Sequence, residues 1–282
     1  MGRHRKTIEL IELAKKILAA EHPMTVRQVY YQLFSCHAIE NTRSAYGGVC
    51  RALVDARLDS AIPWEHIEDR LRRPRHVAMW DGLADFGDFM RRVYRRDVWK
   101  TQPGVLEAWL EKDALSGIFE EVLEPYGVTL NVGRGYDGWS SIHEAAERYG
   151  AGDGSDGRPP VSVIYFGDHD PSGEDMQRSL GERLARLGSH PTIERVAILA
   201  EDIERYNLPP DFTKKTDTRA RNFIETYGDQ AVELDALPPA VLRQRLTEAV
   251  EARMDLGALE AVRRKEKANL RRLDRALVAV PK

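Results

Sequence analysis

The chain has 282 residues, enough for two ordinary domains, and its 31% charged and 42% hydrophobic residues are typical of a globular protein. No apolar run is long enough to cross a membrane, and the first residues are charged and amphipathic rather than a secretory signal. We therefore expect a cytoplasmic protein with no membrane partner. Cys36 and Cys50 are too few, and too far from other cysteines or histidine clusters, for a zinc site or a disulfide framework.

The net charge of -3 conceals an uneven distribution along the chain. Residues 1–100 carry 18 Lys and Arg against 13 Asp and Glu, whereas the remainder carries 24 against 32. Basic residues that gather on one side indicate phosphate binding, although a run of charges also occurs on an ordinary solvated helix face. The densest basic stretch of the first half consists of Arg70, Arg72, Arg73 and Arg75, followed by Arg91, Arg92, Arg95, Arg96 and Lys100.

The first 75 residues predict three helices and an extended segment. Residues 7–20 have apolar positions at helical spacing. A second helix should begin at Thr25, whose hydroxyl can form a capping box with Gln28. A third should cover about 42–60, and residues 62–75 read as a basic, proline-interrupted extended stretch. This order outlines a CAP-like winged helix-turn-helix, which places one helix in the major groove of DNA.

From Gly104 onward, short apolar strands alternate with helical segments, which predicts an α/β domain with a parallel sheet. We expect strands at 104–111, 128–133, 161–167, 194–200 and 231–237, and helices at 113–123, 140–149 and 172–187. A long helix or helix pair should follow Pro239. The predicted organisation is thus a DNA-binding domain over 1–75, a basic linker over 76–103 and an α/β domain with a C-terminal helical extension over 104–282.

Two aspartates follow the apolar run 161–166 in the segment VIYFGDHDPSGEDM. Side chains two apart on a strand point the same way, so the carboxylates of Asp168 and Asp170 should converge. Their repulsion must then be offset by a shared proton, a basic partner or a divalent cation such as Mg²⁺. The alternative is an ordinary turn, because Asp-Pro and Ser-Gly pairs are common in turns.

A third acidic residue, Glu111, ends the first predicted strand of this domain. The carboxyl ends of parallel strands share one edge of a sheet, and ligands gather there. Glu111 could therefore join Asp168 and Asp170 at one site. A lone glutamate at a strand end is otherwise an ordinary solvated residue.

The segment TVRQVYYQLF contains adjacent tyrosines that cannot share one environment on a helix. At roughly 100° per residue, Tyr30 falls on the apolar face, whereas Arg27 and Tyr31 lie together to one side. We expect Tyr30 to pack inward and Tyr31 to face solvent, one turn from a guanidinium that could stabilise a phenolate or a phosphate. The alternative is a surface tyrosine that touches an arginine.

The glycine spacing of GRGYDG, residues 133–138, also matches a dinucleotide-binding turn between a strand and a helix. A nucleotide-binding enzyme is therefore a rival interpretation. Against it, the acidic residue expected about 20 positions later would fall in the glycine-rich loop at Asp153 and Asp156.

Taken together, these motifs resemble a known family. EKDAL at 111–115, GRG at 133–135 and GDHDPSGEDM at 167–176 resemble the Toprim domain. The DxDPxG form, with VELDAL near residue 232, is most similar to the A subunit of DNA topoisomerase VI and its meiotic double-strand-break relative. VRQVYY at 26–31 resembles the winged-helix segment that carries the catalytic tyrosine of that family.

The resemblance implies roles for individual residues. Tyr31 would be the nucleophile and Arg27 its supporting arginine, while Glu111, Asp168 and Asp170 would bind Mg²⁺, or Mn²⁺ in its place. The tyrosine of this family attacks a DNA phosphodiester and becomes linked to the 5′ phosphate, and one subunit's tyrosine works with the other's metal site, which implies a homodimer. The residues expected beside the DNA are Arg70, Arg72, Arg73, Arg75, Lys112, Gly133 and Gly135.

The chain departs from topoisomerase VI in two respects. Helical pattern begins almost at residue 7, so we expect no extension on which an ATPase B subunit could dock, and no Walker-type loop occurs. This shortness resembles the stand-alone "Mini-A" proteins of bacterial mobile elements. The leading hypothesis is a nucleoid-associated, dimeric DNA-breaking enzyme that is related to the topoisomerase VI A subunit, an isomerase. It would act with or without a further protein partner. The alternatives are a Toprim nuclease that hydrolyses DNA without a covalent intermediate, and a non-catalytic DNA-binding accessory protein.

Overall fold

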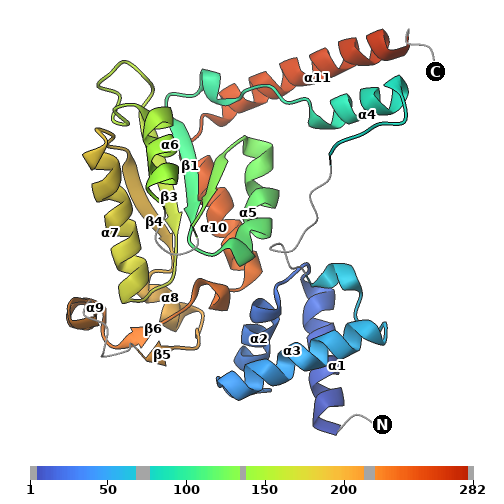
Figure 1. Ribbon diagram of the computed structural model, residues 1–282, viewed down its shortest axis with the longest axis vertical. Helices are drawn as coiled ribbons and strands as arrows, with labels where there is room; N and C mark the ends of the chain where they lie inside the picture. Colours follow the sequence, from blue (N-terminus) through green and yellow to red (C-terminus); the bar gives the residue numbers. More distant parts are fainter. Residues whose placement is uncertain (1–4, 68–76, 134–137, 213–219, 279–282) are drawn as a thin grey trace.

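The protein has a mixed α/β architecture in which three N-terminal helices lie beside a body built on a parallel sheet (Figure 1). The computed structural model describes residues 5–67, 77–133, 138–212 and 220–278. Among these, no helix is long and apolar enough to cross a membrane.

The three N-terminal helices are α1 (Arg5–Ala20), α2 (Val26–Ser35) and α3 (Arg43–Leu58), close to the predicted ranges. Thr25 caps α2 in the predicted capping box with Gln28. Buried leucines from each helix form the core of this group, which confirms the apolar spacing of the sequence. The expected extended stretch begins with a 3-10 helix at Trp64–His66, and its residues 68–75 lie outside the described part of the chain.

Four strands form the parallel sheet that the strand-helix alternation predicts, and their order in the sheet is β2-β1-β3-β4. Their bounds are β1 Val105–Leu110, β2 Thr129–Val132, β3 Val161–Phe166 and β4 Thr192–Ala197. The central strands β1 and β3 are almost wholly buried. Helices cover both faces, which is why these strands read as continuous apolar runs.

The two faces of the sheet have separate hydrophobic clusters. Alternate residues of β1, such as Leu106 and Leu110, belong to the cluster that contains residues of α5 (Ser116–Leu123) and α10 (Pro239–Glu251). Trp109 points the other way and joins residues of α6 (Trp139–Tyr149) and α7 (Pro171–Arg186). The first cluster also includes buried residues of α1, α2 and α3 and therefore extends from the body into the N-terminal helices.

The segment 231–237, predicted as a further strand, does not join the parallel sheet. Gln230–Ala231 forms β6, which pairs antiparallel with β5 (Asp211–Phe212), and a 3-10 helix follows at Leu234–Ala236. Val232 exchanges both backbone hydrogen bonds with His169, just beyond the end of β3. Because these bonds are made across the edge of the sheet, the segment lies over the strand ends. The remaining helices here are α8 (Ala200–Arg205) and α9 (Ala220–Tyr227).

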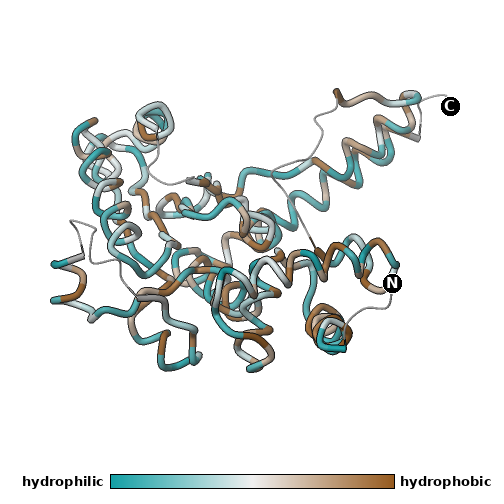
Figure 2. The backbone as a smooth tube through the Cα atoms, turned by 60° about the horizontal axis from the view of Figure 1, so that its bottom comes forward, coloured by the Kyte–Doolittle hydropathy of each residue, from teal (hydrophilic) through white to brown (hydrophobic). Residues whose placement is uncertain are grey.

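The predicted C-terminal helix pair is present as α10 and α11 (Leu256–Val278). The predicted linker 76–103 contains a helix, α4 (Leu83–Val93), and a 3-10 helix at Trp99–Thr101. Helices α4 and α11 lie side by side and project from the body as an arm (Figure 1). Hydrophilic residues recur along α11 in the hydropathy view of Figure 2.

Candidate functional site

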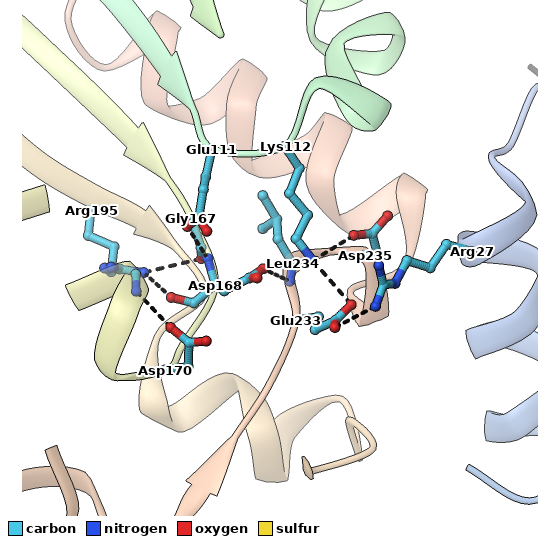
Figure 3. A network of polar contacts seen from close by, with 11 residues as sticks. Arg27, Glu111, Lys112, Gly167, Asp168, Asp170, Arg195, Glu233, Leu234 and Asp235 are labelled. Carbon is cyan, nitrogen blue, oxygen red and sulfur yellow. Dashed lines mark hydrogen bonds and ion pairs between the residues drawn. The ribbon is translucent and has the colours of Figure 1, made fainter. Parts of the chain in front are cut away.

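The C-terminal edge of the sheet holds the acidic residues that the sequence singles out (Figure 3). Strands β1 and β3 are direct neighbours, with Leu110 opposite Phe166, and the Glu111 N–H donates to the Phe166 carbonyl oxygen at 2.9 Å. Glu111 and Asp168 therefore lie at the ends of adjacent strands. The prediction that these two acids share one edge of the sheet is confirmed.

Two glycines of the GDHDPSG motif allow this close arrangement. Glu111 Oε2 accepts the Asp168 backbone N–H at 3.0 Å, and a Cβ on Gly167 would lie only 2.7 Å from the same carboxylate oxygen. A Cβ on Gly173 would overlap the Asp168 carbonyl oxygen. A side chain at either position would displace the Glu111 carboxylate or the first turn of α7.

Asp168 and Asp170 make different contacts, contrary to the expectation that their carboxylates converge. Asp168 Oδ1 accepts the Leu234 N–H at 2.7 Å, whereas Asp170 is the N-cap of α7 and accepts the Gly173 N–H at 2.6 Å. The strand ends at Phe166, so the alternation of strand side chains does not extend to these residues. Within the described ranges, no group of three or more Asp, Glu, His or Cys residues could hold a metal ion.

Lys112 connects the sheet edge with the segment that crosses it. Its Nζ lies 3.0 Å from Asp168 Oδ1, 3.1 Å from Glu233 Oε2 and 2.8 Å from Asp235 Oδ2. Burial disfavours the charged form of the ammonium, but Asp235, Asp168 and Glu233 outweigh this effect and raise the pKa of Lys112. Lys112, expected beside DNA, thus neutralises carboxylates inside the protein.

The two edge carboxyls have perturbed proton affinities. Burial raises the pKa of Glu111 to about 8, and the charges of Asp168 and Asp170 add to this shift. Burial also raises the pKa of Asp168 to about 6, against the opposing effect of Lys112 and the Leu234 N–H. Among the described residues, no cation is as close to the Glu111 carboxylate as Lys112 is to that of Asp168, at 3.0 Å. A cation at this edge would favour the ionised form of both groups.

Tyr31 is buried, which corrects the prediction that it faces solvent. Its exposed fraction is 7%, compared with 4% for Tyr30. Helix α2 packs against Leu234–Ala236, and Tyr31 belongs to the same hydrophobic cluster as Leu234. Burial raises the pKa of the Tyr31 phenol and the Glu233 carboxylate adds to this effect, whereas the positive charges of Arg27 and Lys112 oppose it.

A chain of polar contacts joins Tyr31 to the sheet edge. Arg27 lies near enough to Tyr31 for its charge to lower the pKa of the phenol, and it forms a 2.5 Å ion pair with Glu233. Glu233 in turn contacts Lys112, which contacts Asp168 (Figure 3). Residues from α2 and from two separate edge segments therefore meet in a single network.

Three participants in this region were not among the predicted site residues. Glu233 and Asp235 stand two apart in the VELDAL segment, and their alternation with apolar residues is the signal that could have identified them. Arg195 is a buried cation in β4 whose guanidinium donates to the carbonyl oxygens of Gly167 and Asp168 at 3.1 Å each. Arg195 lies in the strand next to the one that precedes Asp168 and Asp170. An arginine in such a strand is the sequence signal that could have identified it.

Of the residues expected beside DNA, Lys112 and Gly133 belong to the described part of the chain. Gly133 is buried at the end of β2, where its N–H donates to the Leu110 carbonyl oxygen at 2.7 Å. It lies beside β1 and therefore near the sheet edge. The residues Arg70, Arg72, Arg73, Arg75 and Gly135 lie outside the described part of the chain.

The donor set at the sheet edge suits a hard divalent cation. Mg²⁺ commonly binds one or two carboxylates and completes its coordination with water and substrate phosphates. Glu111 and Asp168 provide two such carboxylates at the ends of adjacent strands. Because residue 167 is a glycine, no side chain fills the space beside the Glu111 carboxylate. Asp170 is engaged as a helix cap and is not needed for this smaller set.

Comparison with known protein families and with curated proteins finds no match for this chain.

Proposed function

We propose that this protein breaks DNA phosphodiester bonds with the help of Mg²⁺ or Mn²⁺, and that it is related to the A subunit of topoisomerase VI. Residues 1–75 would form the winged-helix domain and residues 104–282 the Toprim domain. The observation that carries the proposal is the polar network from Tyr31 through Arg27, Glu233 and Lys112 to Asp168. It links two motifs that the sequence separates by more than 100 residues.

Four residues of the site have a proposed role in this reaction. Glu111 and Asp168 would hold the metal ion, which when bound would stabilise negative charge on the phosphate. The Tyr31 hydroxyl oxygen forms a bond to phosphorus and loses its proton, the bond to the 3′ oxygen breaks, and that oxygen takes up a proton. Arg27 is placed to stabilise the phenolate or the phosphate. Tyr31 becomes accessible to DNA only when α2 separates from residues 233–236.

The assembly proposed is a homodimer, because cutting both strands of a duplex requires two half-sites. DNA is the proposed substrate, and the proposed location is the nucleoid. The resemblance to topoisomerase VI extends to strand breakage and not to ATP-driven strand passage, since no Walker-type loop is present in the sequence.

The test is incubation with supercoiled DNA and Mg²⁺ or Mn²⁺, stopped with detergent and analysed by electrophoresis with and without protease. A protease-dependent shift reports a protein-DNA bond. Tyr31→Phe should abolish the adduct, and Asp168→Ala should abolish cleavage. Tyr30→Phe is the matched control, because it removes a neighbouring hydroxyl that is bonded to Asn41 and has no part in the network. Wild-type cleavage without any adduct would contradict the tyrosine mechanism.

The burial of Tyr31 favours a second candidate, a nuclease that hydrolyses DNA at the same carboxylates. In this case water replaces the phenol as nucleophile, and α2 does not need to move. Cleavage that survives in Tyr31→Phe and is lost in Asp168→Ala would select it. Salt-sensitive DNA binding with no cleavage, unchanged by either substitution, would instead identify a non-catalytic accessory protein.

A further inference from the structure

The arm of α4 and α11 brings together two basic stretches that lie far apart in the sequence. The Arg96 backbone N–H donates to Glu266 at 2.7 Å across a separation of 170 residues. Arg91 forms a 2.6 Å ion pair with Asp274 farther along the arm. These contacts fix the basic end of α4 and the segment after it against acidic residues of α11. The arm therefore combines cations that sequence position alone would not group.

Helix α11 carries seven Lys and Arg against three Asp and Glu, and four of the cations form a row. At 100° and about 1.5 Å per residue, the row occupies an arc of about 80° and a length of roughly 16 Å. All four side chains are exposed. The row consists of Arg264, Lys267, Arg271 and Arg275. We refer to these residues below as the basic row.

The acidic residues of α11 already have partners, whereas the contact given for the basic row within the described residues is the one that Arg275 makes with the Arg271 carbonyl oxygen at 3.3 Å. Glu260 pairs with Arg263 at 3.2 Å and Asp274 with Arg91. Glu266 accepts the Arg96 N–H. Across the ranges that the structure describes, no carboxylate forms an ion pair with any member of the basic row. The positive charge of the row is thus available to an external anion.

A groove adjoins the N-terminal end of the basic row. Its volume is about 680 Å³, and it lies between the segment that follows α4, the turn at Glu124–Gly127 and α11. Five cations and three carboxylates line it, and Glu124 lies 3.6 Å from Arg95. The cations are Arg95, Arg96, Arg263, Arg264 and Lys267, and the carboxylates are Glu124, Glu260 and Glu266, so positive charge is in excess. The groove and the row therefore form one positively charged track.

We propose that this track binds the phosphate backbone of duplex DNA away from the candidate cleavage site. The identification of the polyanion as DNA rests on the proposed function. A linear row with a cation on each helical turn suits a regular series of phosphates, which are bound chiefly through Lys and Arg. The arm joins the body just before β1 begins, whereas Asp168 lies at the opposite end of the strands (Figure 1). DNA on the arm would therefore be a segment remote from the cleaved bond.

The experiment measures the salt dependence of DNA affinity by fluorescence anisotropy with a labelled duplex and the full chain. The variant Arg264→Gln/Arg271→Gln removes two members of the row. The matched control Lys265→Gln/Arg272→Gln removes the same charge from exposed positions about 100° around the helix. Glutamine preserves helix propensity in both. Removing two phosphate contacts should lower the slope of log K against log salt by up to about 1.8. The control should retain the wild-type slope.

Different outcomes separate this inference from the proposed function. An unchanged slope in the row variant, or an equal loss in both variants, overturns the track even if the wild type forms covalent DNA adducts. A loss confined to the row variant supports the track even if no adduct ever forms. A wild type that does not bind DNA contradicts both proposals. The same variants are tested on anionic lipid vesicles and on polyglutamate, and a selective loss there with DNA binding unchanged overturns the assignment to DNA.

Discussion

Glu111 is a buried carboxyl at the end of β1 whose ionisation is opposed by its surroundings. Burial and two neighbouring aspartates hold its pKa at about 8, compared with 4.5 for an ordinary glutamate. Between these values the folded state keeps a proton that the unfolded chain releases. The free energy of unfolding must therefore fall as the pH rises through this window. Asp168, with a pKa of about 6, acts in the same direction.

We predict that the metal-free protein melts at a lower temperature at pH 8 than at pH 5. The raised pKa of Glu111 corresponds to a change on the order of a few kcal/mol in the free energy of unfolding. For a chain of this length, this lowers the melting temperature by about 5 °C or more. Glu111→Gln should flatten the profile, because the amide does not ionise. Mg²⁺ should raise the melting temperature most at pH 8, where the carboxylates are ionised. Thermal melts at constant ionic strength measure this dependence.

Glu201→Gln, which alters an exposed carboxylate of α8, is the matched control and should keep the wild-type pH profile. A profile as steep in Glu111→Gln as in the wild type would show that other groups determine the pH dependence. Equal stabilisation by Mg²⁺ at both pH values would argue against binding at these carboxylates.

At the scale of elements, most helices and strands follow from local patterns, because apolar periodicity and caps are properties of the segment itself. The docking of α2 is different. The periodicity of α2 correctly identifies its own apolar face, which includes Tyr30. It contains no information about the segment 233–236, which arrives from 200 residues later and packs against α2. The prediction of a sheet strand over residues 231–237 is wrong for a related reason. A short apolar run does not show which partner accepts its backbone hydrogen bonds.

We predict that Arg27→Gln loosens the contact between α2 and residues 233–236. The substitution removes the ion pair with Glu233 and leaves that carboxylate with Lys112 alone. Both partners are partly exposed, so the melting temperature should change little. Hydrogen exchange of the α2 amides should accelerate severalfold, while exchange in β1 and β3 stays unchanged. Arg5→Gln, which removes an exposed pair within α1, is the control. Unchanged exchange in α2 would mean that apolar packing alone holds the helix.

At the scale of the whole molecule, the sequence could predict two regions but not how they are joined. The parallel sheet could be predicted, because strands that alternate with helices favour parallel pairing. The arm could not be predicted, because the amphipathic pattern of α4 does not show which helix covers its apolar face. The hydrophobic core that the two regions share could not be predicted from the sequence either. Buried residues of α1, α2 and α3 belong to the same hydrophobic cluster as Leu106 and Leu110 of β1.

This continuous core predicts that the N-terminal helices and the sheet unfold together. Leu18 of α1 is fully buried in it, so Leu18→Ala should cost about 2–5 kcal/mol, or roughly 10 °C in melting temperature. Calorimetry should show a single transition that shifts as a whole, and the amides of β1 and β3 should lose protection to the same extent as those of α1. Leu58→Ala, at a position 66% exposed on α3, should have little effect. A transition that splits in two, with the strands still protected after α1 has melted, would show that the two regions fold independently in spite of their contact.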